Sequence, residues 1–273
     1  MMQATLRDTL HFEGVGLHTG EYAKVDVQPA QADHGLWFVL GETRIPAIAE
    51  YVLDTSRATV LGRDGASIST TEHLLSALFA MGVTNADVHV AGPEIPARDG
   101  SAAEFVAAIL ASGLETQTRP RRVLELEKPF VVRDGERMIA ALPSPVFRVR
   151  FVADFHPPIG TQYFDAEIDR QEYLEEVASA RTFAFLDEVE ALRARGLGRG
   201  GSLENALIFA ADGPIQPLRW PNEAVRHKVL DLIGDMALLG AWPHCEFVAI
   251  KSGHELHASI TRDLRTRLGV ASV

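Results

Sequence analysis

The sequence predicts an α+β fold with two similar domains, each a sheet with packed helices. Strand-like alternation followed by helical periodicity occurs twice along the chain, before about residue 113 and again after residue 123. The halves also share a weak internal similarity, because HLLSALFAMG (73–82) and DLIGDMALLG (231–240) have the same length, end at glycine and precede a strand. Strands with packed helices that occur twice favour two similar α+β units.

The first half is expected to contain one strand hairpin and two helices. A helix should begin near Ser69, because Ser69 and Glu72 fit a capping box and Gly82 fits a C-terminal stop. Alternating apolar residues indicate the strands, with HTGE as the first turn. The expected elements are strands at 11–20 and 21–30, a helix at 69–82, a strand at 86–92 and a helix at 101–113.

The segment ETQTRPRR, residues 115–122, is polar and contains a proline, so the domain boundary is expected there. This divides the chain into domains 1–117 and 118–273. Asn222 is a good N-cap for a long helix, and RDGE (133–136) is a turn. The expected elements of the second half are strands at 123–132, 137–143 and 147–155, helices at 170–185 and 187–196, a strand at 205–210, a helix at 222–240, a strand at 245–253 and a helix at 258–268.

Composition excludes several classes of protein. The 273 residues carry 26 Lys and Arg against 37 Asp and Glu, a net charge of −11, whereas nucleic-acid binders usually have a basic excess. The single cysteine, Cys245, excludes a disulfide framework and a cysteine-based zinc site, and we expect it to be buried. The chain start lacks the apolar core of a signal peptide, and no run approaches the roughly 20 apolar residues of a membrane span. A cytoplasmic protein is expected.

The helix at 222–240 raises a question about three polar residues. At 100° per residue, His227, Asp231 and Asp235 fall on one side, opposite an apolar stripe of Val225, Val229, Leu232 and Met236. They form either an ordinary solvated face or part of a metal site. From the spacing alone, the solvated face is the better interpretation.

The helix at 69–82 favours the metal site. It is apolar nearly all round after Glu72 and His73, so it should be buried, and a buried ionisable pair needs partners. Taken singly, each residue also has an ordinary structural explanation. Glu72 could be a capping residue and His73 a hydrogen-bonded core histidine. Elsewhere in the chain, His254 could be a loop histidine, and Thr182 could be a helix residue that bonds to its own backbone.

Together these residues fit one chemistry. Two histidines and an aspartate provide three zinc ligands and leave one position for water, which zinc activates near neutral pH. A carboxylate can then act as base and a histidine as acid, as in amide hydrolysis. The His-Glu-x-x-His pattern of zinc peptidases is absent.

Six motifs resemble one family along residues 4–265. They are GVGLHTG, STTEHLLSAL, GPEIPARDGSAAEFV, ARTFAFLDEVEALRARGLGRGGSLENALIF, RHKVLDLIGD and KSGHEL. The set is similar to UDP-3-O-acyl-N-acetylglucosamine deacetylase, a zinc amidase of lipid A biosynthesis. The resemblance implies two α+β domains that form a sandwich with the active site between them.

The resemblance also implies the reaction and the residues. Acetate is removed from UDP-3-O-(3-hydroxyacyl)-N-acetylglucosamine, the committed step of lipid A biosynthesis, by a zinc-bound water with Glu72 as base and His254 as acid. The implied zinc ligands are His73, His227 and Asp231. Three further residues are implied to support catalysis: Thr182 stabilises the oxyanion, Asp235 is the charge partner of His254, and Lys228 contributes a positive charge. Three others are implied to contact the substrate: Phe183 lies beside the sugar and nucleotide, Leu17 lies under the sugar, and Arg137 lies near the diphosphate.

An apolar passage for the acyl chain is expected in the second domain, within 150–180 and 195–212. One motif departs from the family, because His257 and Ala258 stand where many members have two asparagines. A monomer without nucleic-acid partners is expected. Two alternatives remain open: a related enzyme with the same zinc site but another N-acetyl sugar substrate, and a non-catalytic nucleotide-sugar or zinc-binding protein.

Overall fold

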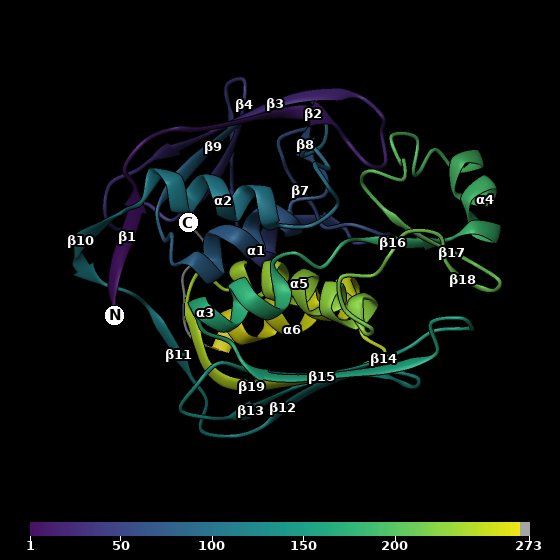
Figure 1. The fold of residues 1–273 in the computed structure, drawn as a ribbon. Coiled ribbons are helices and arrows are strands. Elements are labelled where there is room, and N and C mark those ends of the chain that lie inside the picture. The colour runs from purple at the N-terminus through teal and green to yellow at the C-terminus, as the bar shows by residue number, and fades with distance from the viewer. Residues whose placement is uncertain (268–273) are drawn as a thin grey trace.

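Two sheets face each other with helices between them, which confirms the expected α+β fold with two similar halves (Figure 1). The computed structural model describes residues 1–267. The first sheet has the strand order β2-β3-β9-β4-β5. Its central strand β9 is antiparallel to β3 and parallel to β4. The strands are β2 (Leu10–Val15), β3 (Tyr22–Pro29), β4 (Leu36–Leu40), β5 (Thr43–Pro46) and β9 (Ala86–Ala91).

The second sheet repeats this topology. Its order is β12-β13-β19-β14-β15, and the central strand β19 is antiparallel to β13 and parallel to β14. A short extra strand, β11, pairs with β19. The repeated strand order is stronger evidence that the halves are related than the weak sequence similarity of 73–82 and 231–240. The strands are β11 (Val123–Glu125), β12 (Phe130–Asp134), β13 (Arg137–Pro143), β14 (Arg148–Asp154), β15 (Thr161–Glu167) and β19 (Trp242–Ile250).

Each central strand lies between two helices in the chain. In the first half the order is α1 (Glu72–Met81), β9, α2 (Ala103–Ser112), and in the second it is α5 (Glu223–Ala237), β19, α6 (His254–Arg267). The helices α1 and α5 pack against each other between the sheets (Figure 1). Their contact is close, because a Cβ added to Gly234 would lie 2.1 Å from the carbonyl oxygen of Glu72.

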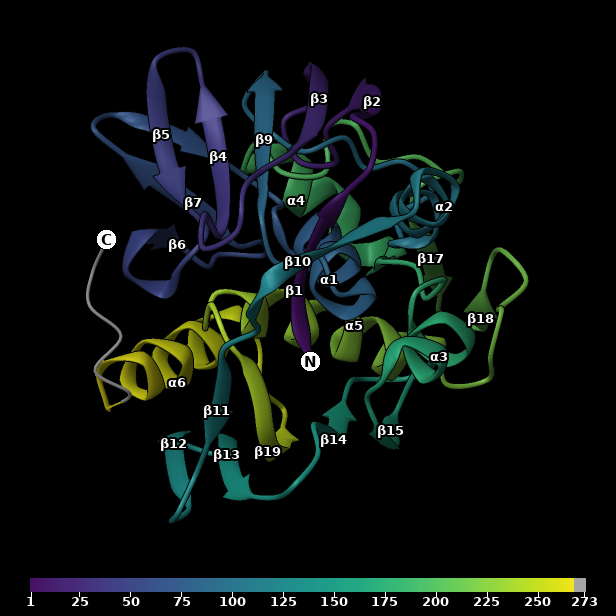
Figure 2. The ribbon, with the colours of Figure 1, turned by 90° about the vertical axis from the view of Figure 1, so that its left-hand side faces the viewer.

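Three small sheets complete the fold. The chain passes between the halves through β10 and β11 on one side of the molecule (Figure 2). The expected boundary at residue 117 lies inside β10, which pairs with β1. The small sheets are β1 (Met2–Leu6) with β10 (Leu114–Pro120), β6 (Val52–Asp54) with β7 (Val60–Arg63) and β8 (Ala66–Ile68), and β16 (Phe183–Phe185) with β17 (Leu207–Ala210) and β18 (Gly213–Pro214). The remaining α-helices are α3 (Arg170–Glu172) and α4 (Val189–Ala194).

Burial decides the question about the long helix. All ten residues of α1 are buried, as its apolar sequence predicts. The polar side of α5 is buried too, including His227, Asp231 and Asp235. The interpretation of these three residues as a solvated face is therefore wrong. Cys245 is fully buried in β19, as expected.

Some expected elements differ from the structure. The helix expected at 170–185 stops by Val177, and its last residues form β16. The strand expected at 123–132 is split into β11 and β12. The last helix begins at His254 rather than 258, and residue 268 at its expected end lies outside the described residues. The strands β1, β4 to β8, β10, β15 and β18 were not expected.

Candidate active site and metal centre

One cavity of about 1050 Å³ collects nearly all the residues that the sequence singles out. It lies where the first turn of α1 and the first half of α5 meet the loops around β16 to β18. Both halves of the molecule contribute to its lining. The expected residues that line it are Leu17, Glu72, His73, Arg137, Thr182, Phe183, His227, Lys228, Asp231 and His254. Only Asp235 is behind the lining, hydrogen-bonded to His254.

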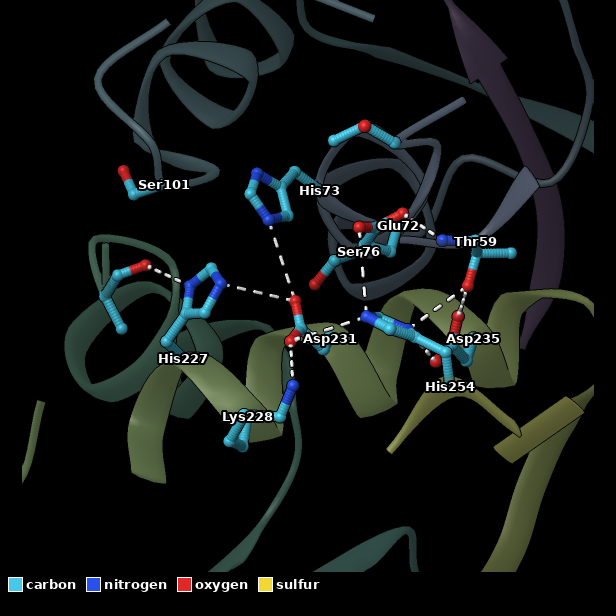
Figure 3. Close-up of polar contacts among 12 residues, drawn as sticks. Thr59, Glu72, His73, Ser76, Ser101, His227, Lys228, Asp231, Asp235 and His254 are labelled. Atoms are coloured by element: carbon cyan, nitrogen blue, oxygen red, sulfur yellow. Dashed lines mark hydrogen bonds and ion pairs between the residues drawn. The ribbon is translucent and has the colours of Figure 1, made fainter. Parts of the chain in front are cut away.

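Two histidines and an aspartate converge from α1 and α5. The Nε2 atoms of His73 and His227 lie 3.6 and 3.4 Å from Oδ1 of Asp231 (Figure 3). The imidazole rings are nearly perpendicular, with centroids 5.0 Å apart. All three side chains are buried, and their facing ligand atoms lie within 4.8 Å of one another. This arrangement can hold a metal ion.

The hydrogen bonds around the cluster fit a metal ion better than a self-contained polar network. Among the described residues Oδ1 of Asp231 is buried without a hydrogen-bond partner, whereas Oδ2 accepts a 2.6 Å bond from Nζ of Lys228. Nδ1 of His227 donates to the carbonyl of Ala180 at 3.0 Å, which leaves the lone pair of Nε2 facing Asp231. Metal-bound histidines usually have such a carbonyl partner.

Charge favours metal binding at His227 and Asp231; at His73 burial alone would lower the pKa, but Asp231 and Glu72 raise it. Burial lowers the pKa of His227 to about 4, so the ring stays neutral and can act as a ligand. Burial alone would raise the pKa of Asp231, but the Lys228 ammonium and the His73 ring hold it well below its usual value. Burial alone would lower the pKa of Lys228, but the Asp231 carboxylate raises it and keeps the ammonium charged.

Glu72 is the first residue of α1, and its carboxylate is buried beside the cluster. Its Oε2 accepts a 3.0 Å bond from the backbone N–H of Thr59, and its Oε1 lies 4.0 Å from Nε2 of His254. The predicted capping box with Ser69 is wrong, because the N-cap is Thr71 and the Glu72 carboxylate is engaged by Thr59. Burial raises the pKa of Glu72, which suits a group that must accept a proton.

His254 begins α6 and is held by Asp235. Its Nδ1 lies 2.8 Å from Oδ2 of Asp235, and the other carboxylate oxygen accepts a 2.5 Å bond from the Thr59 hydroxyl. Burial alone would lower the pKa of His254, but Asp235 and Glu72 raise it to about 9. Burial alone would raise the pKa of Asp235, but His254 and His257 lower it to about 2. The pair therefore combines a protonated imidazole with an ionised carboxylate.

Thr182 and Phe183 lie in an extended segment rather than in the expected helix. The backbone N–H of Thr182 donates to Gly100 and its carbonyl accepts from Leu207, both at 2.8 Å. These long-range bonds hold the segment against another loop and a strand, so it does not continue the helix. Phe183 begins β16 and lies edge-on to His227, with ring centroids 6.3 Å apart.

Leu17 and Arg137 also line the cavity. The loop that carries Leu17 is tied to the buried carboxylate of Glu94, which accepts bonds from the backbone N–H groups of His18 and Thr19. Arg137 pairs with Asp134 and, at 2.9 Å, with Glu255.

Two supporting residues, Thr59 and Glu94, were missed by sequence reasoning. Glu94 lies in a motif that carries the family resemblance, but neither residue has a local pattern that reveals its partner. Thr59 lies 13 positions from Glu72 and 176 from Asp235, so only the folded chain brings these groups together.

A separate part of the cavity is apolar. Its side chains come from α4, its flanking segments and the β17–β18 region; three of them lie within the range 195–212 expected for an acyl passage, and four lie outside both expected ranges. They are Leu186, Val189, Leu192, Leu203, Ala206, Ile208 and Ile215.

Comparison with known proteins agrees with this geometry. Residues 3–266 match the family model described as LpxC, UDP-3-O-acyl N-acetylglycosamine deacetylase. The chain belongs to this family. Relatives described as UDP-3-O-acyl-N-acetylglucosamine deacetylase include one from Syntrophotalea carbinolica, 43% identical over 93% of this chain and 85% of the relative. A second relative, from Phenylobacterium zucineum, is 44% identical over 98% of this chain and 94% of the relative. A third, from Thermosynechococcus vestitus, is 42% identical over 95% of this chain and 93% of the relative.

Membership of the deacetylase family makes the chain an amide hydrolase of lipid A biosynthesis. The buried histidine and aspartate cluster is consistent with a metal site in such an enzyme. None of the described helices is long and apolar enough to cross a membrane.

Proposed function

We propose that the chain removes acetate from UDP-3-O-(3-hydroxyacyl)-N-acetylglucosamine, the committed step of lipid A biosynthesis, with zinc held by His73, His227 and Asp231. The unpartnered Oδ1 of Asp231 carries this proposal. A buried carboxylate oxygen without a hydrogen bond is costly, and among the described residues the two imidazole nitrogens that face it, at 3.6 and 3.4 Å, form no hydrogen bond with it. Two histidines and one carboxylate are a common protein donor set of catalytic zinc.

Bound zinc would supply Lewis acidity, which polarises the amide carbonyl and lowers the pKa of water. Glu72 is placed to take the proton from the attacking water, because its carboxylate is buried beside the ligands and faces the cavity. The Thr59 N–H fixes one carboxylate oxygen, and the other oxygen is left near the reaction centre. The raised pKa of Glu72 favours proton uptake.

His254 is the proposed acid. Its Nδ1 is engaged by Asp235, so its Nε2, 4.0 Å from Glu72 and 3.9 Å from Asp231, faces the cluster. A protonated ring in this position can donate a proton to the leaving nitrogen of the sugar. The collapse of the tetrahedral adduct then gives acetate and a free amine.

Thr182 and Lys228 are proposed to stabilise the oxyanion that forms on the acetyl carbonyl. Both side chains line the cavity beside the ligands, and an O–H donor and an ammonium are suitable groups for this charge. Lys228 also keeps Asp231 ionised through its 2.6 Å bond.

The remaining cavity residues fit parts of the substrate. Phe183 offers an aromatic face for the sugar and nucleotide, and Leu17 an apolar floor for the sugar ring. Arg137 is proposed to contact the diphosphate, which would replace its contact with Glu255. The apolar part of the cavity is the proposed passage for the acyl chain. A monomeric enzyme with domains 1–117 and 118–273 is also part of the proposal.

Acetate release tests the reaction and the metal together. Purified protein is assayed with UDP-3-O-(3-hydroxymyristoyl)-N-acetylglucosamine before chelation, after chelation and after zinc is restored. We expect release to stop with the chelator and return with zinc. Substrates with several acyl lengths and other N-acetyl sugars are run in parallel. Release from another sugar alone would favour the related enzyme with a different substrate.

Replacing Glu72 by Gln tests the base. The amide keeps an oxygen that can accept from Thr59 but is not a base, so we expect kcat to fall roughly 100- to 10,000-fold. Zinc content and unfolding temperature, measured on the same sample, should stay close to those of the wild type. Undiminished acetate release by this variant would rule out Glu72 as the base.

A further inference from the structure

A second histidine, His257, contacts Asp235 but does not line the active-site cavity. It lies one turn after His254 on α6 and is fully buried. Its Nδ1 is 2.8 Å from Oδ2 of Asp235, and its Nε2 is 2.9 Å from the hydroxyl of Ser252. Both ring nitrogens therefore have a polar partner, and neither faces the cavity.

The directions of these hydrogen bonds follow from the chemistry of the groups. Asp235 is ionised, with a pKa of about 2, so its oxygens only accept. Nδ1 of His257 must then carry the hydrogen. Burial lowers the pKa of His257, so the ring is neutral and its Nε2 accepts from the Ser252 hydroxyl. A single chain of donors runs from Ser252 through His257 to Asp235.

The Asp235 carboxylate is thereby surrounded by donors. Thr59 donates to Oδ1 at 2.5 Å, while His254 and His257 both lie 2.8 Å from Oδ2. Rotation of the carboxylate would break several of these bonds at once. Nδ1 of His254 is thus held on one fixed oxygen, and its Nε2 keeps its direction toward Glu72.

We propose that His257, held by Ser252, is a positioning residue that fixes the Asp235 carboxylate and so orients the His254 ring for proton donation. This inference rests on the proposed function, in which His254 is the acid. It gives a role to the motif in which His257 replaces a residue that is often asparagine in the family. His257 is not one of the residues that line the cavity, and both nitrogens of its ring are engaged away from it, so its side chain reaches His254 through Asp235.

If His257 only packed in the core, its variants would behave differently. Two polar variants distinguish this packing role from the proposed positioning role. The amide nitrogen of Asn lies near the place of Nδ1 in histidine, whereas the amide of Gln lies near Nε2. His257→Asn therefore keeps the donor to Asp235, and His257→Gln loses it. Gln has the better helix propensity and is closer in size, so a role in packing alone favours Gln over Asn.

The experiment compares kcat and KM of zinc-loaded His257→Asn, His257→Gln and Ser252→Ala with those of the wild type. For His257→Gln we expect kcat to fall roughly 10- to 100-fold with KM within about twofold, the range seen when a supporting hydrogen bond is lost. His257→Asn should stay within about threefold of the wild-type kcat, and Ser252→Ala should lie between. Equal activity of Asn and Gln variants with matched unfolding temperatures, or higher activity of Gln, would overturn the proposal.

A second measurement does not depend on turnover. Ring-nitrogen NMR of the zinc-loaded wild type should show hydrogen on Nδ1 of His257, and this hydrogen-bonded signal should change in Ser252→Ala. Hydrogen on Nε2 instead would contradict the proposed direction of the chain. If wild-type protein has the expected NMR signals but releases no acetate, the proposed function fails while the arrangement around Asp235 stands.

Discussion

At the scale of single residues, Asp231 divides its two oxygens between different partners. Lys228 occupies Oδ2, and Oδ1 is left to the two histidines. A lysine on one oxygen lowers the pKa of the carboxyl group without blocking the other oxygen. The same helix thus supplies a proposed ligand and the cation that keeps this carboxylate ionised.

Replacing His227 by Ala should remove one of three metal ligands. Because loss of even a supporting partner costs 10- to 100-fold in metal affinity, we expect zinc to bind more than about 100-fold more weakly. The measurement is zinc content after dialysis against a chelator of known affinity. His244→Ala is the matched control, since His244 lies on β19 and pairs with Glu125 at the surface. Unchanged zinc retention in the His227 variant would remove His227 from the ligand set.

At the scale of elements, the site depends on the close approach of α1 and α5. A glycine at position 234 lets the backbone of Glu72 lie directly against α5. The C-terminal ends of the two helices are stabilised by arginines. Arg265 donates to the carbonyl of Leu239 at 2.7 Å, and Arg121 donates to Phe79 at 3.4 Å. Positive charge at a helix C-terminus is favourable, so these arginines have a structural explanation.

Gly234→Ala should separate α1 from α5. The added Cβ would lie 2.1 Å from the Glu72 carbonyl oxygen, so backbone must move. We expect a loss of about 1–3 kcal/mol in the free energy of unfolding, together with reduced acetate release, because Glu72 and the ligands shift. Urea unfolding measures the first and the standard assay the second.

Gly253→Ala provides the control for this variant. A Cβ at Gly253 meets no atom within 4 Å, so its free energy of unfolding should change little. If Gly234→Ala is as stable as this control, the two helices tolerate a wider separation than their contact suggests.

Sequence reasoning predicted the long helices better than the segments between them. The helix at 222–240 has strong periodicity and clear ends, and α5 begins one residue after its expected start and ends three residues before its expected end. The helical pattern at 170–185 failed at its end because tertiary bonds to Gly100 and Leu207 hold Thr182 in extended backbone. Strands of three or four residues, such as β6 and β8, are too short for alternation to be visible.

The same distinction applies to the site. Family motifs named nine of the cavity residues and the wider resemblance named Arg137, but the hydrogen bonds of Thr59 and His257 join positions that only the fold brings together. Sequence also suggested a wet face for α5, because periodicity alone does not distinguish buried polar groups from solvated ones. In the structure α5 packs against α1, and its polar side is therefore buried.

At the scale of the whole molecule, two halves with the same strand order place equivalent helices face to face. Glu72 and His73 come from the first half, and His227, Asp231 and His254 come from the second. The site therefore exists only when the halves are docked. A second link across the halves joins Asp99 to Arg219, whose Nη2 donates to the carboxylate at 2.9 Å.

Asp99 should make stability depend on pH. Burial alone would raise its pKa, but bonds from Ser101 and Arg219 lower it. A carboxyl group with a lowered folded pKa stabilises the fold above its unfolded pKa and loses this effect as pH falls through the folded pKa. Asp99→Asn should therefore be less stable than the wild type at pH 7, and the difference should shrink at acidic pH. Equal stability at pH 7 would show that the link contributes nothing measurable.

Zinc should stabilise the whole chain, because its proposed ligands come from both halves. A ligand that binds only the folded state at 100 times its dissociation constant adds about 2.7 kcal/mol to the free energy of unfolding. For a chain of this length we expect a rise of roughly 5–10 °C in the unfolding temperature on addition of zinc to metal-free protein. His73→Ala should lose most of this rise although it keeps both ligands of the second half. If zinc raised the unfolding temperature of His73→Ala as much as that of the wild type, the metal would not join the two halves, and the proposed ligand from α1 would be wrong.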